Sequence, residues 1–271
     1  MTQARETQLA YSDLMDKMLD EDHRRAKARK LLRVIAHFRG RDDLERLRVA
    51  DVGCSAGFIA DELAAAGGRT IGVDIDQPGL AKAAARFGNR VLFTLAQGDQ
   101  LPIPARSINV IIFNHIYEHV LDPDAVVSEL HRVLADDGVI YFGLGNRLGV
   151  MEPHYRLPFL SYLPPVAADR YVRASGRASH YHERFRTRPA LRRLVRGFNV
   201  WDYTFSIIRE PSRFESGDMV RGPMSSVPTP ILKVLLPVLP TYIWLATKSP
   251  RPPAGPDLLT PPARVKVDPA R

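Results

Sequence analysis

Short apolar segments alternate with helical patterns along residues 48–144, and this alternation limits the possible folds more than any other feature of the chain. The segments typical of strands are residues 48–52, 69–73, 91–95, 108–113 and 139–144. Helical patterns lie between them at residues 59–66, 79–87 and 122–134. Strands that alternate with helices at such spacing form parallel sheets with helices on both faces. We therefore expect an α/β fold.

The flanking segments suggest a division of the chain into three parts. Residues 1–44 carry apolar side chains at helical spacing among many charges, which predicts an N-terminal helical segment. Residues 45–248 contain the alternating region and form the main domain. Residues 249–271 are rich in proline and have no apolar periodicity, which predicts a disordered tail.

The second half of the main domain is less regular than the first. Residues 147–187 are interpreted as one insertion, and residues 209–240 as a second one that contains a short apolar helix at 230–239. Two late strands are predicted at residues 198–208 and 241–247.

The net charge of +8 is unevenly distributed along the chain. Residues 1–150 contain 19 basic and 21 acidic side chains, whereas residues 151–271 contain 19 basic and 9 acidic ones. The basic excess is densest between residues 156 and 196. Such asymmetry favours an anionic partner, and it leaves open whether that partner is a substrate, a membrane surface or a nucleic acid.

Composition excludes several classes of protein. Cys54 is the single cysteine, so neither a disulfide framework nor a thiolate metal cluster can form. The N-terminal residues have no apolar core typical of a secretory signal, and the most apolar stretch, residues 231–246, is short and broken by prolines. We expect a cytoplasmic protein and assign no metal ligands, and whether the protein uses a metal is left open.

The most specific motif is the segment Val49-Ala-Asp-Val-Gly-Cys-Ser-Ala-Gly57, in which a strand ends at glycines and a helix begins. Glycines let the backbone approach a ligand closely, and a helix N-terminus offers N–H groups to it. The third glycine of the dinucleotide fingerprint is missing. Asp51 would also repel a pyrophosphate, but it suits a ligand with positive charge. A tight turn without any ligand is the alternative.

Further polar residues follow the neighbouring strands. Asp74 lies 21 residues after Gly53, the spacing at which a carboxylate accepts hydrogen bonds from ribose hydroxyls. Asp99 follows the third strand, where it would approach an adenine amino group, and Asn114 follows the fourth. The ends of these strands meet at the ligand-binding edge of an open α/β sheet. Solvated loop carboxylates would explain any one of these residues, but they explain the whole set poorly.

The chain resembles the class I S-adenosylmethionine-dependent methyltransferases, in their small-molecule, type 11-like branch, over most of residues 45–250. The segments that carry the resemblance are the turn described above, Gly72-Val-Asp74, Gly98-Asp99 with Leu101-Pro102, Tyr117-Glu-His-Val120 and residues 130–138. The resemblance implies a Rossmann-like sheet of seven mostly parallel strands with helices on both faces. The last strand is expected to be antiparallel, because the two late strands match the closing hairpin of the family.

The resemblance also implies S-adenosylmethionine as the cofactor and assigns residues to it. Asp51, Gly53 and Gly57 would hold its methionine part, and Asp74 its ribose. Ser55 stands where the family often has a glycine, which affects only the expected local backbone geometry. The complete set of cofactor-binding candidates is Asp51, Gly53, Cys54, Ser55, Gly57, Asp74, Ile75, Gly98, Asp99, Gln100, Asn114 and His115.

The acceptor side is less constrained by the sequence. Methyl transfer depends mainly on holding the nucleophile in line with the methyl group, and a base is needed only when the acceptor must lose a proton. His119 and His154 are the candidate catalytic residues, although a capping or packing role is equally compatible. Tyr117, His154, Tyr155 and Arg156 are the candidate substrate contacts. Arg156 would clamp a phosphate or carboxylate, or it belongs to a solvated basic face.

The acceptor predicted from these features is the oxygen of a small molecule, or of a glycan- or lipid-linked one. Residues 114–117 lack the prolines typical of enzymes that methylate exocyclic base amines, and Cys54 lies in the wrong place to attack a cytosine. An RNA methyltransferase, a nicotinamide-binding enzyme and a non-catalytic Rossmann-like protein remain the alternatives. The apolar helix at 230–239 packs in the core or contacts the inner membrane surface peripherally.

Overall fold

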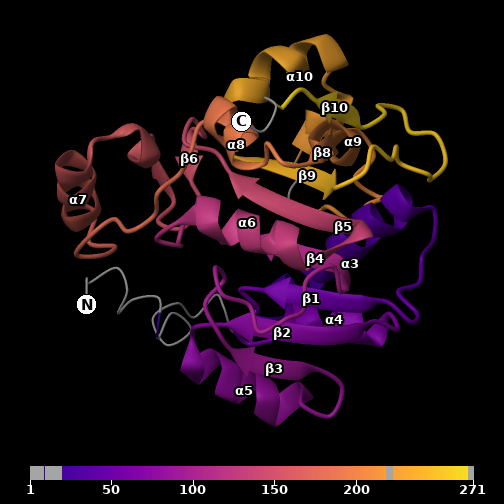
Figure 1. Cartoon of the computed structure of the whole chain (residues 1–271). Helices are drawn as coiled ribbons and strands as arrows, with labels where there is room; N and C mark the ends of the chain where they lie inside the picture. Colours follow the sequence, from indigo (N-terminus) through magenta and orange to yellow (C-terminus); the bar gives the residue numbers. More distant parts are fainter. Residues whose placement is uncertain (1–8, 10–19, 218–221, 268–271) are drawn as a thin grey trace.

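A computed structural model describes residue 9, residues 20–217 and residues 222–267. Its centre is one eight-stranded sheet with the order β10-β8-β9-β5-β4-β1-β2-β3 (Figure 1). The strands are β1 (Arg48–Val52), β2 (Arg69–Asp74), β3 (Leu92–Leu95), β4 (Ile108–Asn114), β5 (Leu134–Gly145), β8 (Asn199–Asp202), β9 (Thr241–Thr247) and β10 (Ala263–Val265). The strand order reverses between β1 and β4, which is where open α/β sheets bind their ligands.

The predicted mostly parallel sheet with an antiparallel late strand is confirmed. Strands β3, β2, β1, β4 and β5 pair in parallel, and β9 lies antiparallel between β5 and β8. The sheet has eight strands rather than the expected seven, because β10 adds an antiparallel strand beside β8.

The expectation of a disordered tail is wrong for the described residues up to 267. Besides forming β10, the tail buries Leu258 and Val265. Its backbone carbonyls also accept hydrogen bonds from side chains of the domain, including one from Trp201 Nε1 to the oxygen of Arg251 at 2.9 Å. A proline-rich segment lacks apolar periodicity but keeps its carbonyl acceptors, so anchoring of this kind leaves no periodic signal.

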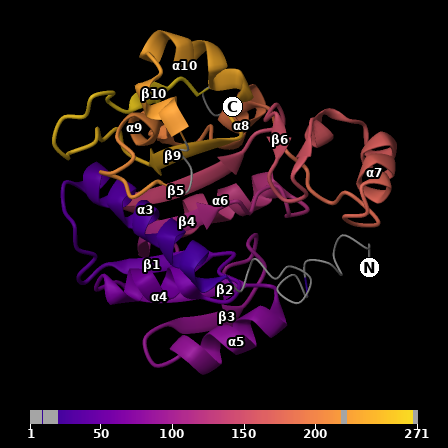
Figure 2. The same ribbon diagram turned by 180° about the vertical axis from the view of Figure 1, so that it is seen from behind.

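Helices cover both faces of the sheet (Figures 1 and 2). One face packs against α6 (Pro123–Val133) and α8 (Arg188–Leu194), and the other against α3 (Glu21–Arg39), α4 (Phe58–Ala65) and α9 (Thr204–Arg209). The sequence of β4 explains this arrangement: Ile111 and Phe113 point to the first face, Val110 and Ile112 to the second, and all four are fully buried. A strand that is apolar on both sides needs two covering layers. The helix α5 (Gln77–Phe87) packs beside β3.

The predicted strand at 198–208 is only partly present. β8 ends at Asp202, and α9 then begins at Thr204. The Asp202 carboxylate accepts a hydrogen bond from the backbone N–H of Thr204 at 2.9 Å, which turns the chain into the helix. Ile207 and Ile208 are buried in α9, and they would also be buried in a strand. Their apolar character therefore does not distinguish a helix from a strand.

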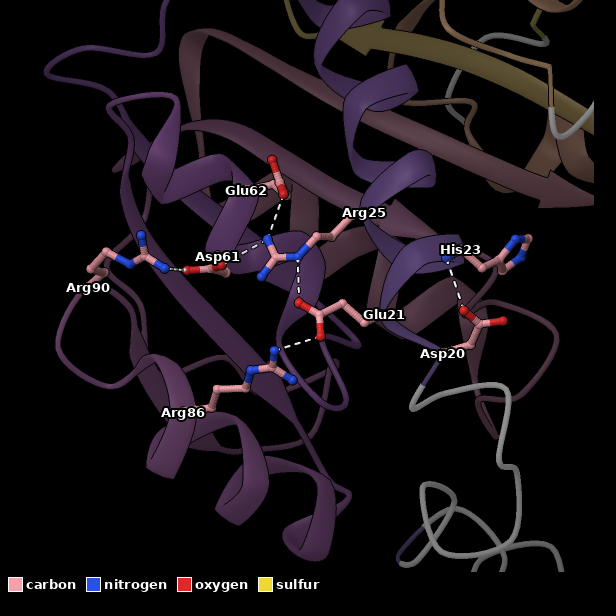
Figure 3. A network of polar contacts seen from close by, with 8 residues as sticks. All are labelled: Asp20, Glu21, His23, Arg25, Asp61, Glu62, Arg86 and Arg90. Atoms are coloured by element: carbon pink, nitrogen blue, oxygen red, sulfur yellow. Dashed lines mark hydrogen bonds and ion pairs between the residues drawn. The ribbon is translucent and has the colours of Figure 1, made fainter.

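The helix α3 is held over the sheet by a network of charges (Figure 3). Arg25 donates to Glu21 at 2.9 Å on its own helix, and to Asp61 at 3.1 Å and Glu62 at 2.6 Å on α4. Arg86 of α5 donates to Glu21 at 2.6 Å. Because Asp61 is buried, this network ties α3 to α4 and α5 in one orientation. The part of the predicted N-terminal helical segment before Asp20, apart from Leu9, lies outside the described residues.

The insertion at 147–187 forms a small unit beside the sheet. It contains the two-stranded sheet of β6 (Met151–Glu152) and β7 (Leu157–Pro158), the short helix η2 (Leu160–Tyr162) and α7 (Pro165–Ala174). Leu160, Ala168 and Val172 form part of its own core. Figures 1 and 2 show α7 at the outer side of the molecule, away from the sheet.

The second insertion contains η3 (Gly222–Ser226), α10 (Thr229–Leu235) and η4 (Leu236–Val238). Only Leu232 and Leu239 of the predicted apolar helix are buried, whereas Ile231 and Val234 are 52% and 78% exposed. Within the described residues, none of the helices is long and apolar enough to cross a membrane.

Candidate active site

A cavity of about 510 Å³ opens at the carboxyl ends of β1, β2 and β4, a size typical of small-molecule sites. Most of the predicted cofactor residues line it: Asp51, Gly53, Cys54, Ser55, Asp74, Ile75, Asn114 and His115. Gly57, Gly98, Asp99 and Gln100 are not part of the lining, and their contact with a cofactor stays a prediction.

Asp74 fixes the shape of the loop between β1 and α4. One carboxylate oxygen accepts a hydrogen bond from the backbone N–H of Ser55 at 2.7 Å. The other accepts from the N–H groups of Ile75 at 2.7 Å and Asp76 at 2.9 Å. The end of β2 therefore holds the loop in place, while Asp74 still lines the cavity.

The loop needs backbone conformations that glycine adopts most easily. Gly53 and Gly57 have φ values of 84° and 78°, and a Cβ atom on Gly57 would lie 2.8 Å from the ring of Phe93. Ser55 has a φ of 46°, so it adopts a left-handed conformation that glycine reaches most easily.

Asp51 is a buried carboxyl that lines the cavity, 2% exposed. No group in the described part of the chain donates a hydrogen bond to its Oδ2. Burial and the nearby charge of Asp74 raise its pKa to about 7, although Arg24 acts in the opposite direction. A buried carboxylate with one unpartnered oxygen fits a ligand that brings a positive charge, such as the ammonium group of a methionine moiety.

The helix α3 supplies a wall of the cavity that the sequence analysis did not identify. Arg24, Lys27, Lys30 and Leu31 line it beside the loop after β1. Their spacing of three and four residues places them on one face of the helix, and this spacing was the available signal. A cavity with these basic side chains favours an anionic group on the ligand.

The candidate catalytic histidines come together at the cavity. The rings of His119 and His154 lie 4.9 Å apart at 90°, and both line the cavity. His154 Nδ1 lies 2.8 Å from Oε1 of the buried Glu152. Burial lowers the pKa of His119 to about 4. Burial would also lower the pKa of His154, but its hydrogen bond to Glu152 and the charge of Glu183 outweigh this effect and raise it.

Three buried carboxyl groups surround these histidines: Glu118, Glu152 and Glu183. Glu118 lies with Oε1 3.3 Å from His115 Nδ1, but no described residue contributes a hydrogen bond to its Oε2. Burial raises the pKa of Glu183 to about 7. The signal for this cluster was the proximity in sequence of Glu118 to His119 and of Glu152 to His154.

The other predicted substrate residues differ in their position relative to the cavity. Tyr117 is buried in the core, and its hydroxyl donates to the carbonyl oxygen of Gly145 at 2.5 Å and accepts from the N–H of Arg186 at 3.0 Å. Tyr155 is buried in the core of the insertion. Neither lines the cavity, and their contact with an acceptor stays a prediction. Arg156 is exposed and lines the cavity, as its prediction requires.

Comparisons with known proteins agree with this geometry. Residues 50–142 match the family model described as a methyltransferase domain. Residues 50–142 thus carry a methyltransferase domain similar to those that use S-adenosylmethionine. A possible histamine N-methyltransferase from Thermotoga maritima has the same fold, with a TM-score of 0.52, 16% identity and coverage of 86% of this chain and 94% of that one. The YcgJ protein from Bacillus subtilis gives a TM-score of 0.51 at 17% identity, covering 83% and 99%.

Curated relatives match the methyltransferase domain over part of their length. A probable S-adenosylmethionine-dependent methyltransferase from Mycolicibacterium smegmatis is 36% identical over 109 residues, which is 40% of each chain. A ubiquinone biosynthesis O-methyltransferase from Idiomarina loihiensis is 30% identical over 159 residues, 53% of this chain and 57% of the relative. The chain therefore spans about two fifths to three fifths of these relatives.

Proposed function

We propose that this protein transfers the methyl group of S-adenosylmethionine to an oxygen of a small, anionic acceptor. The observation that carries the proposal is one cavity that is lined both by cofactor candidates and by His119, His154 and Arg156. Such a cavity places a cofactor and an acceptor in direct contact, which methyl transfer requires.

The residues of the chain have separate tasks in this reaction. S-adenosylmethionine, when bound, supplies an electrophilic methyl group on a positively charged sulfur. The Asp51 carboxylate stabilises the ammonium group of the cofactor, and Asp74 accepts hydrogen bonds from its ribose. The new bond forms between the acceptor oxygen and the methyl carbon, while the electron pair of the broken carbon–sulfur bond stays on sulfur.

An oxygen acceptor is supported by the histidine pair. A hydroxyl group loses its proton when it is methylated, so a base beside it accelerates the reaction. His154 is oriented by Glu152 in the way that carboxylates orient catalytic histidines, and its imidazole would take up the proton. The relatives named for ubiquinone biosynthesis are O-methyltransferases, which favours the same class of acceptor.

The test is transfer of isotope-labelled methyl groups from S-adenosylmethionine to a panel of phenols, hydroxy acids and sugar phosphates. We expect an anionic hydroxyl compound to be labelled by the wild-type protein, and the turnover of His154→Gln to be about 100-fold lower. His180→Gln, which changes a histidine outside the cavity, should keep full activity. Labelling of amines alone would overturn the proposal of an oxygen acceptor.

We further propose that the acceptor is presented at an anionic lipid surface. The helices α10 and η4 expose Ile231, Val234, Leu235 and Val238 beside Lys233, and the second half of the chain is strongly basic. Apolar side chains next to basic ones favour binding to the interface of an anionic membrane. The chain continues from η4 into Pro240 and Thr241, which line the cavity.

Flotation with liposomes tests this contact. We expect the protein to float with vesicles that contain phosphatidylglycerol at low salt, and Val234→Glu to reduce the floating fraction strongly. Val166→Glu changes a similarly exposed apolar residue of α7, 66% exposed, and should float like the wild type. Failure of the wild-type protein to float at low salt would contradict the proposal.

A further inference from the structure

The cluster of Glu118, His119 and His154 has the composition of a metal site. One potential ligand atom from each residue lies within 4.8 Å of the other two. Two imidazoles and one carboxylate are a ligand set used for catalytic zinc and related divalent ions. Because ligand atoms around a tetrahedral zinc lie about 3.3 Å apart, small side-chain rotations would bring the three atoms to bonding distance.

The surroundings of two of the three residues, His154 and Glu118, resemble the outer shell of a metal site. His154 Nδ1 interacts with Glu152, which leaves Nε2 as its ligand atom. Glu118 Oε1 lies near His115, which leaves Oε2 as its ligand atom. Carboxylate and imidazole partners of this kind fix the orientation of metal ligands in many sites. Both partners are present before any ion binds.

The negative charge of the cluster and its unpaired carboxylate oxygen also favour the binding of a cation. Glu118 is 1% exposed, and its Oε2 has no hydrogen-bond partner among the described residues. Glu152 and Glu183, also buried, lie close enough to His154 to act on its charge. A buried carboxylate oxygen without a partner is costly, and a bound cation would satisfy it.

We propose that Glu118, His119 and His154 bind one divalent transition-metal ion, with zinc as the first candidate. Three protein ligands leave at least one coordination position open, and His119 and His154 place it at the cavity. This inference rests on the proposed function for the role of the ion, which is to hold the acceptor oxygen. A hydroxyl bound to a divalent ion loses its proton more easily. In the ion-bound protein that proton would go to solvent, and the role of His154 as a base given above would apply to the ion-free protein.

Calorimetric titration of the full chain with zinc, after treatment with a chelator, tests the site without any measurement of activity. We expect one ion per chain, with Glu118→Gln and His154→Ala each weakening binding by about 100-fold or more, and Glu152→Gln by about tenfold. Cobalt should give visible absorption bands in the wild type that are lost in Glu118→Gln. The control His180→Ala/His182→Ala removes two histidines outside the cluster and should bind zinc like the wild type.

Titration with S-adenosylhomocysteine in the same samples separates this inference from the proposed function. Retained binding of that compound by Glu118→Gln and His154→Ala shows that the variants are folded. No zinc binding by the wild type, or zinc binding by Glu118→Gln and His154→Ala equal to that of the wild type, would overturn the metal site and leave the methyltransferase proposal intact. Zinc binding without any binding of S-adenosylhomocysteine would support the metal site and contradict the proposed function.

Discussion

At the scale of single residues, the buried Asp51 carboxylate lowers the stability of the ligand-free protein and also forms part of the proposed cofactor site. Its pKa in the folded protein is about 7, whereas an aspartate in an unfolded chain titrates near 4. A carboxyl group with a raised pKa in the folded state makes the protein less stable as the pH rises from about 4 to about 7. The cavity therefore holds a carboxylate that destabilises the ligand-free protein, and a cationic ligand would compensate for it.

Replacement of Asp51 by asparagine should separate the two effects. We expect Asp51→Asn to increase the free energy of unfolding of the ligand-free protein, by about 2 kcal/mol more at pH 8 than at pH 5. The same variant should bind S-adenosylhomocysteine much more weakly at pH 8. Urea unfolding at the two pH values gives the first quantity. An equal gain at both pH values would mean that the pKa of Asp51 is not raised.

The position of Ser55 illustrates what could be inferred about single residues from the sequence. The motif predicted a tight turn, and the turn is present with Ser55 in a left-handed conformation. The packing of Tyr117 could not be inferred, because a tyrosine after a strand is compatible with either a buried or a ligand-facing side chain. The buried position of the Tyr117 hydroxyl is stabilised by hydrogen bonds with Gly145 and Arg186, which are distant in sequence.

At the scale of elements, the packing of α3 against α4 affects the shape of the site. Arg25 connects it to the buried Asp61 of α4, while Lys27 and Lys30 on the same helix line the cavity. Loosening this connection should therefore affect both the stability of the fold and the shape of the cavity.

We expect Arg25→Ala to lower the free energy of unfolding by about 2 kcal/mol, because it removes a partner of a buried carboxylate. It should also weaken the binding of S-adenosylhomocysteine. Arg33→Ala is the matched control on α3, since Arg33 pairs with Glu215 in an exposed position, and such pairs contribute about 1 kcal/mol or less. Equal effects of the two substitutions in denaturant unfolding would refute this role for Arg25.

The elements also differ in how well their sequences predicted them. Strands β1, β2 and β4 were found because apolar runs ended by glycine or polar residues have few alternatives. The segment at 198–208 was assigned wrongly, because the apolar residues of α9 are buried as they would be in a strand. One of the contacts at this turn joins Asp202 to Thr204, and apolar periodicity does not report such a contact.

At the scale of the whole molecule, the cavity is assembled from segments that are far apart in the sequence. The loop after β1, the end of β2, the loop after β4, the helix α3 and the first insertion all contribute to it. The resemblance to a family gave the first three, because their motifs are local. The basic wall from α3 and the tail that completes the sheet depend on tertiary contacts, and the sequence alone did not reveal them.

The most direct test of the central claim is calorimetric titration of the purified chain with S-adenosylhomocysteine and, separately, with NADH. We predict one site for S-adenosylhomocysteine and no binding of NADH. Asp74→Asn should weaken binding by about tenfold or more, because hydrogen bonds to a charged group contribute about 1.5 to 3 kcal/mol. Asp136→Asn, at an exposed carboxylate outside the cavity, should bind like the wild type. Binding of NADH, or no binding of S-adenosylhomocysteine, would contradict the assignment of this cavity to a methyl donor.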